Sequence, residues 1–294
     1  MIDVVTQVLD NVFSPLTLAM TLIVLGDIVV ERSGVLNIGI DGVVVLSIAL
    51  SFSLSIALGN PVAVLGVVVA AAVIVALLVS LAVNLLVSSH VLTGLAIGFA
   101  CYGVGTMAAL PYLGTAPRIS LSMHWYTVLG LSAALAVATW YVLYYTKAGI
   151  AVRAAGNNPY AAEALGVHVW RVRTLALVVG YSLIALGGAV YELGYIGIWS
   201  QGLGVGRGWL GLSLAIASMW HPIAALGITA VYSYVETSMW ALQLTAGVPA
   251  AVINAMPFLT ALGIVIAVHL TPVHRRVSPP RALGAEYFRE ERTA

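Results

Sequence analysis

Polar side chains cluster around a glycine-rich break between two apolar stretches near the start of the sequence. Residues 31–42 read ERSGVLNIGIDG and include Glu31, Asn37, Asp41 and three glycines. Carboxylates and amides surrounded by apolar sequence are costly to bury, so they are candidate functional residues. We therefore predict a site for polar chemistry at Asn37 and Asp41. Glu31 either belongs to the same site or, with Arg32, only marks a short turn.

Further polar residues interrupt later apolar stretches: Asn84, Glu192, Glu236, Gln243 and Asn254. We expect Asn84 to hydrogen-bond between helices, an interaction worth about 0.6 kcal/mol in membranes. Glu192 and Glu236 are expected near the outer ends of their helices. There they line the mouth that receives substrate, contact a docked binding protein, or are solvated at the membrane interface.

The sequence offers no pattern for covalent or metal-dependent catalysis. The glycines of stretch 202–208 lack the Gly-Lys-Ser/Thr ending of a phosphate-binding loop, so we interpret the stretch as a flexible outer loop. The six histidines are scattered without metal-ligand spacing, and no Ser/His/Asp arrangement can be argued. Cys101 is the only cysteine, which excludes an intramolecular disulfide, and a net charge of +1 does not indicate a nucleic-acid partner.

The composition places these residues in a membrane. Hydrophobic residues make up 61% of the 294 residues and charged residues 8%, with a mean hydropathy of +1.05. Soluble chains carry about 25% charged residues, because water must solvate their surface. Too few charges remain to cover a soluble surface, so we expect lipid to cover it.

Apolar runs long enough to cross a bilayer recur along the chain. We predict about nine spanning segments, near 14–30, 42–58, 61–86, 91–110, 125–145, 174–195, 209–220, 222–243 and 251–270. The run at 209–220 is short, which predicts a half-helix or a re-entrant segment. Gly94 and Gly98 form a Gly-x-x-x-Gly step, which predicts close helix packing. The expected fold is an all-α transmembrane bundle at residues 1–272, followed by a polar tail at 273–294.

The distribution of cations predicts the orientation of the bundle. Nine of the twelve Lys and Arg residues lie in two segments: Lys147, Arg153, Arg171 and Arg173 in loop 146–173, and Arg275, Arg276, Arg281, Arg289 and Arg292 in the tail. Cytoplasmic segments are enriched in cations, so both are assigned to the cytoplasm. Four runs separate them, an even number, and extrapolation backwards places the N-terminus outside the cell membrane.

The 146–173 loop contains signals for a short helix. Asn158 is a suitable N-cap, Pro159 suits the first helical position, and Gly166 suits the left-handed residue after the helix end. A helix of about two turns is marginal alone, because isolated helices need about 12–15 residues. We expect it either to dock into a partner or to be an ordinary amphipathic connector.

Three stretches resemble permease subunits of ATP-binding-cassette (ABC) importers. Ala162, Glu163, Ala164 and Gly166 look like the coupling motif that sits in a cleft of the ATPase subunit. Residues 31–42 closely resemble a signature of the simple-sugar and nucleoside branch, a ribose-type family related to branched-chain amino acid permeases. Stretches 206–209 and 220–222 are similar to the same branch. Asp41 replaces its usual Glu, and His221 replaces the commoner Asn.

The resemblance implies a subunit that forms a pathway for a small polar solute, most naturally a nucleoside or simple sugar. It implies coupling to the ATPase through Asn158, Pro159, Ala162, Glu163, Ala164 and Gly166, and a pathway near Glu31, Asn37 and Asp41. Asn84, a polar residue inside an apolar run, is a further pathway candidate from the sequence itself. ATP and Mg would be bound by a separate cytoplasmic ABC ATPase, and this chain would hold no cofactor or metal. A second permease subunit, forming a heterodimer, and an extracytoplasmic substrate-binding protein are the other expected partners.

Three alternatives stay open from the sequence. A branched-chain amino acid ABC permease would share the fold and the coupling loop and differ in substrate. An ion-coupled secondary carrier would need carboxylates at the midplane and usually an internal repeat, and no repeat is evident. A membrane enzyme lacks a supporting constellation of residues.

Overall fold

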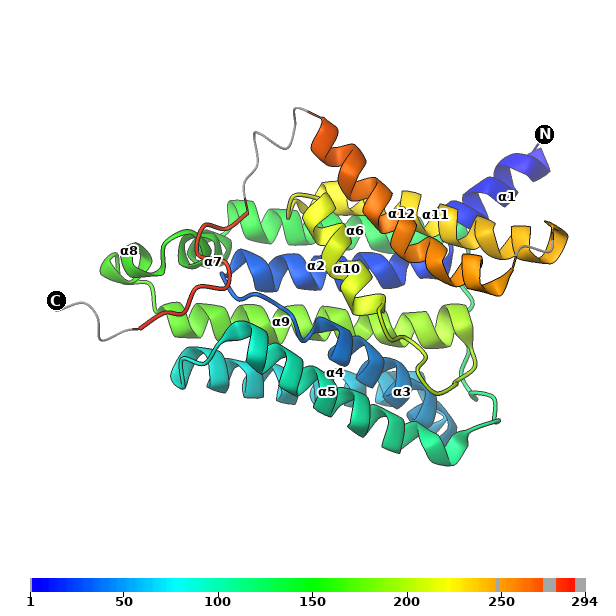
Figure 1. Cartoon of the computed structure of the whole chain (residues 1–294), viewed down its shortest axis with the longest axis horizontal. Helices are drawn as coiled ribbons and strands as arrows, with labels where there is room; N and C mark the ends of the chain where they lie inside the picture. Colours follow the sequence, from blue (N-terminus) through cyan, green and yellow to red (C-terminus); the bar gives the residue numbers. More distant parts are fainter. Residues whose placement is uncertain (1, 247–248, 272–278, 289–294) are drawn as a thin grey trace.

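The fold of the described residues is a bundle of helices without strands (Figure 1). The computed structural model describes residues 2–246, 249–271 and 279–288. Their helices are, in chain order, α1 Ile2–Val12, α2 Pro15–Arg32, α3 Ile40–Leu58, α4 Pro61–Ser80, η1 Leu81–Leu85, α5 His90–Ala109, η2 Leu110–Tyr112, α6 Trp125–Tyr145, α7 Lys147–Asn157, α8 Pro159–Ala164, α9 Val169–Val190, η3 Tyr191–Ile196, α10 Arg207–Ala217, α11 Pro222–Ala246 and α12 Ala250–Leu270.

Each predicted spanning run corresponds to a helix, and the all-α prediction is confirmed. Within the described residues, seven helical stretches are long and apolar enough to cross a membrane: Thr6–Arg32, Ile40–Leu58, Pro61–Leu85, His90–Tyr112, Trp125–Tyr145, Val169–Ile196 and Ala251–Leu270. Helix α11 has 25 residues, whereas α10 has 11 residues. At 1.5 Å per residue, α10 is about 16 Å long and covers only half of the hydrocarbon core. The prediction of a half-helix at 209–220 is confirmed.

Helices α2, α3 and α9 form the centre of the bundle, and α2 is buried along almost its whole length. Helices α2 and α9 make the most extensive contact, and α4 also packs on α9. Large apolar side chains on α4, α5, α6 and α12 point away from this centre and are exposed. A bundle with an apolar exterior of this kind is stable in lipid, where the exposed side chains meet acyl chains.

Glycines allow the closest helix contacts. A Cβ atom on Gly42 of α3 would lie 2.4 Å from the Cα of Gly98 on α5, and one on Gly26 of α2 would lie 2.4 Å from the carbonyl oxygen of Gly180 on α9. Neither distance leaves room for a side chain. The close packing predicted from Gly94 and Gly98 is confirmed, because both lie against the start of α3.

The two cation-rich segments meet at one end of the bundle. Helices α7 and α8 and the tail segment 279–288 gather there, while α1 lies at the other end (Figure 1). The backbone N–H of Ala282 donates to the Gly156 carbonyl oxygen at 2.9 Å, and that of Gly284 donates to the Gly34 carbonyl oxygen at 3.0 Å. This agrees with an even number of crossings between them. The side of the membrane that this end faces stays a prediction, and residues 272–278 and 289–294 lie outside the described part.

The short helix expected in the loop is present with its predicted ends. Asn158 Oδ1 accepts a hydrogen bond from the Ala161 N–H at 3.0 Å, and Pro159 is the first residue of α8. Gly166 follows the helix with φ +88°, the left-handed conformation expected after a helix end. Leu165, at the same end, is 86% exposed. Docking of α8 on an ATPase stays a prediction.

Candidate translocation site

Helix α10 begins inside the bundle, at the end of a glycine-rich loop. The loop 197–206 runs from the end of η3 back between the helices (Figure 1). Gly202, Gly204 and Gly206 all have positive φ, and Gly204 and Gly206 are buried. The interpretation of stretch 202–208 as an outer loop is therefore wrong for its second half. Its glycines allow the tight turns by which the chain re-enters the bundle.

Asp41 holds the N-terminal end of α10. Its Oδ2 accepts a hydrogen bond from the Gly206 N–H at 2.9 Å, and its Oδ1 accepts one from the Gly208 N–H at 2.6 Å. The Tyr102 hydroxyl also donates to Oδ2. The first N–H groups of a helix have no partner within it, and an acidic group there also interacts favourably with the helix dipole. Asp41, on α3, thus caps a helix that lies far away in the sequence.

The C-terminal end of α10 is held by Glu31 and Arg32, which directly precede the glycine-rich break. Arg32 Nη2 donates to the carbonyl oxygens of Met219 at 3.2 Å and Trp220 at 3.1 Å. Trp220 Nε1 donates to Glu31 Oε2 at 2.5 Å. Met219 and Trp220 have φ of 54° and 53°, unusual values for residues other than glycine. Glu31 is buried and bonded here, so it does not merely mark a turn.

Asn37 ties the break to the central helices. Its Nδ2 donates to Asp27 Oδ1 of α2 at 2.8 Å, and its Oδ1 accepts from the Tyr181 hydroxyl of α9 at 2.9 Å. All three side chains are buried. Irregular backbone at membrane depth needs such internal partners, because lipid supplies none.

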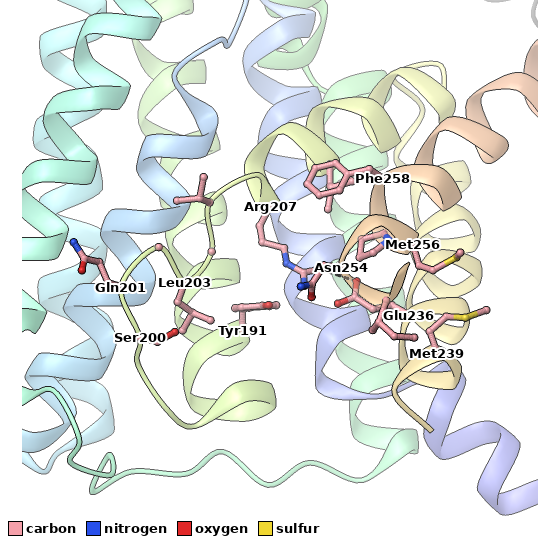
Figure 2. A pocket seen from close by; sticks show the side chains of 16 residues that line it. Tyr191, Ser200, Gln201, Leu203, Arg207, Glu236, Met239, Asn254, Met256 and Phe258 are labelled. Atoms are coloured by element: carbon pink, nitrogen blue, oxygen red, sulfur yellow. Dashed lines mark hydrogen bonds and ion pairs between the residues drawn. The ribbon is translucent and has the colours of Figure 1, made fainter. Parts of the chain in front are cut away.

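A cavity of about 480 Å³ lies beside the start of α10, and we call it the Arg207 cavity. Figure 2 shows the side chains around it. Residues from η3, the glycine loop, α10, α11 and α12 line it: Tyr191, Ser200, Gln201, Gly202, Leu203, Gly204, Val205, Arg207, Leu210, Glu236, Met239, Ile253, Asn254, Met256, Pro257 and Phe258. A cavity of this size is large enough for a small solute.

Arg207 and Glu236 form an ion pair on the wall of this cavity. Arg207 Nη1 lies 2.7 Å from Glu236 Oε2 and donates to the Tyr232 hydroxyl oxygen at 3.1 Å. The guanidinium carbon also lies 5.2 Å from the centre of the Tyr191 ring. The two charges neutralise each other, which reduces the cost of holding them in a buried site. The described part of the wall is therefore polar and carries no net charge.

The predicted site residues divide into two groups. Glu31, Asn37 and Asp41 do not line the Arg207 cavity, but Glu31 and Asp41 hold the two ends of the half-helix that carries Arg207. Asn84 lies elsewhere, in η1, beside a hollow near α8 that Glu163 also lines. Its Nδ2 donates to Ser80 Oγ of the preceding helix at 3.1 Å. Ser80, rather than Asn84, forms the hydrogen bond to α9, and its partner there is Thr174.

Sequence reasoning missed Arg207 and recognised Glu236 only in part. Glu236 lines the cavity, as one of its three interpretations proposed, and both Glu192 and Glu236 are buried rather than solvated. Arg207 carried a signal in the sequence, since it is the only Lys or Arg between residues 174 and 274. Its partner could not be read from the sequence, because 28 residues separate it from Glu236.

Comparison with known proteins agrees with a transport role for this arrangement. Residues 12–267 match the family described as branched-chain amino acid transport system / permease component. The match covers most of the chain, from the end of α1 into α12. The chain belongs to this family of permease components. This permease is therefore a multi-pass protein of the plasma membrane and a component of a transport system.

Several curated relatives are ABC transporter permeases. The permease is 27% identical to the guanosine ABC transporter permease protein NupQ of Bacillus subtilis over 62% of its own length and 57% of that protein. It is 28% identical to the putative glucose ABC transporter permease protein TsgC13 of Haloferax volcanii over 90% of its length and 93% of the relative. Over 40% of its length and 38% of the relative, it is 33% identical to the nucleoside ABC transporter permease protein NupC of Lactococcus lactis. No solved structure matches the chain.

Proposed function

We propose that this permease is the membrane subunit of an ABC importer for nucleosides or simple sugars, and that the Arg207 cavity is part of its pathway. The observation that carries the proposal is a cavity between α10, α11 and α12 with a polar wall and no net charge. A neutral polar solute can replace its hydration there with hydrogen bonds to the wall. The curated names of the relatives, which include guanosine, nucleosides and glucose, support the same class of solute.

ATP hydrolysis in this proposal belongs to a separate cytoplasmic ABC ATPase that docks on α8. A second permease subunit completes the pathway, and an extracytoplasmic protein delivers the solute. Helix α8 suits docking, because it is short, capped at both ends and lies at the cation-rich end of the bundle. The ATPase pushes α8 as it closes around ATP.

A continuous series of contacts runs from α8 to the Arg207 cavity. Helix α7 leads directly into α8, and its Gly156 packs so closely on the Arg32 carbonyl that an added Cβ would lie 2.2 Å from that oxygen. Arg32 and Glu31 bind the C-terminal end of α10, and Asp41 binds its N-terminal end, next to Arg207. We propose that movement of α8 is transmitted to the cavity through α7 and residues 31–41. The half-helix α10, which is held at both ends, would then move as a unit.

The coupling segment can be tested by Glu163→Lys and Gly166→Val. Charge reversal at Glu163 changes the surface offered to the ATPase, and a side chain at Gly166 costs roughly 1–2 kcal/mol in the left-handed conformation. Both variants should insert into the membrane normally, lose ATPase co-purification or uncouple ATP hydrolysis, and lose guanosine or glucose uptake. Thr115→Lys, an exposed change at the opposite end of the bundle, is the matched control.

Three results would contradict the proposal. Normal uptake and normal ATPase binding by both α8 variants would make the segment a simple connector. Uptake by the wild-type chain in vesicles without any ATPase would favour an ion-coupled carrier. Import of leucine in place of guanosine and glucose would favour a branched-chain amino acid permease.

A further inference from the structure

We propose that the Arg207 cavity contains a selective binding site, in which Glu236 accepts a hydrogen bond from a hydroxyl group of the solute and Phe258 covers a flat apolar face of it. This inference rests on the proposed function, because it places the transported solute in that cavity. It adds the residues that select the solute and the kind of solute they select. The chemistry fits a nucleoside better than a simple sugar.

An unpartnered buried oxygen supplies the first part of the argument. Glu236 is 3% exposed, and its Oε2 is bonded to Arg207. Its Oε1 has no hydrogen-bond partner among the described residues. A buried acceptor without a partner is unfavourable, and a hydroxyl group of a solute in the cavity would satisfy it. The site therefore favours a solute that brings hydrogen-bond donors.

A proline in α12 provides a second acceptor on the same wall. Pro257 lies inside the helix, and both Pro257 and Ile253 line the cavity. Proline has no N–H, so the carbonyl oxygen of Ile253 does not receive the usual hydrogen bond from four residues later. This carbonyl oxygen and Glu236 Oε1 can both accept hydrogen bonds from donor groups of the solute.

The remaining wall has a polar side and an apolar side. Figure 2 shows Ser200 and Gln201 on one side of the Arg207–Glu236 pair and Met239 and Met256 on the other. Phe258 extends the apolar part and reaches Gly206, where an added Cβ would lie 2.8 Å from its Cζ. Aromatic rings and methionine sulfur both make favourable contacts with flat π systems.

Charge and shape together define the solute. Among the described residues that line the wall, only Arg207 and Glu236 are charged, and they neutralise each other. A phosphorylated solute would find no net positive charge, so the site rejects it. A hexose offers the Phe258 side only the C–H face of its ring, which is smaller than a nucleobase and has no π system to stack on the aromatic ring. A nucleoside has a ribose with hydroxyl donors and a flat base, which matches both sides.

The test measures uptake by the complete transporter, with its partner subunits, in vesicles supplied with ATP. The probes are guanosine, glucose and guanosine 5′-monophosphate. Glu236→Asp keeps the charge but withdraws the free oxygen, so the KM for guanosine should rise about tenfold or more, the effect of one lost charge-assisted hydrogen bond. Phe258→Leu removes the aromatic face from a half-exposed position and should reduce the preference for guanosine over glucose.

The matched control is Glu192→Gln, which changes another buried glutamate that does not line the cavity and should leave the KM unchanged. If Glu236→Asp fails to accumulate in the membrane, Phe258→Leu decides the result alone. ATP-dependent uptake of guanosine with a KM within about twofold of wild type in the variants would overturn this inference and leave the proposed function intact. A wild-type transporter that prefers glucose, or accepts the monophosphate equally well, would overturn it too. Failure of the wild type to import guanosine or glucose at all would instead refute the proposed function.

Discussion

Replacement of Asp41 by Asn tests the cap that holds the half-helix. The side chain keeps its size, but one acceptor oxygen becomes an NH₂ group and the charge is lost. In the wild-type protein the Gly206 N–H and the Tyr102 hydroxyl donate to Asp41 Oδ2. If the amide oxygen of Asn stays near Gly208, its NH₂ group faces these two donors. Two donors then meet at Gly206, and its N–H loses its partner.

The expected loss can be worked from these contacts. Hydrogen bonds to a charged group contribute about 1.5–3 kcal/mol and neutral ones about 0.5–1.5 kcal/mol, so each surviving bond from Gly208 and Trp209 weakens by about 1 kcal/mol. The unpartnered Gly206 N–H adds a further cost of about 1–3 kcal/mol. Docking of the α10 N-terminus should therefore weaken by roughly 3–5 kcal/mol, the sum of these effects. A loss of that size displaces Arg207 from the cavity in most molecules.

The assay compares solute uptake at matched membrane expression, together with the melting temperature of the purified protein. Asp41→Asn should lower the melting temperature and abolish most of the uptake, while the protein still inserts. Asp41→Glu keeps the carboxylate, the group that the resembling permeases carry there, and should retain most of the activity. Wild-type uptake and an unchanged melting temperature for Asp41→Asn would refute the capping argument.

Two further predictions concern topology and packing. In a Cys101→Ser background, cysteines at the exposed positions Asn157 and Thr115 should react with impermeant reagents from opposite sides of the membrane, with Asn157 on the cytoplasmic side; labelling from the same side would refute the crossing count. Gly42→Val should lower the melting temperature strongly, because its Cβ would lie 2.4 Å from the Gly98 Cα, whereas Gly103→Val, with no atom within 4 Å, should change it little. Equal melting temperatures of these two variants would contradict the packing of α3 on α5.

Local sequence signals predicted the positions of the long helices and both ends of α8. Apolar runs separated by polar or glycine-rich breaks marked the positions of the long helices, since lipid requires about 20 apolar residues for each crossing. Asn158, Pro159 and Gly166 predicted both ends of α8, because capping uses residues within one turn of the helix. The short run at 209–220 predicted a half-helix for a similar reason, as too few residues were present to cross.

Only the tertiary structure showed what these polar residues do. Asp41 was recognised as a candidate, but its role depends on Gly206 and Gly208, which lie 165 and 167 residues later. The pairing of Arg207 with Glu236, and the cavity that they line, likewise need the folded arrangement of α10, α11 and α12. Hydrophobic periodicity and capping describe a segment and its nearest neighbours. Which buried polar groups meet is decided by helix packing, because each one must find a partner wherever the bundle places it.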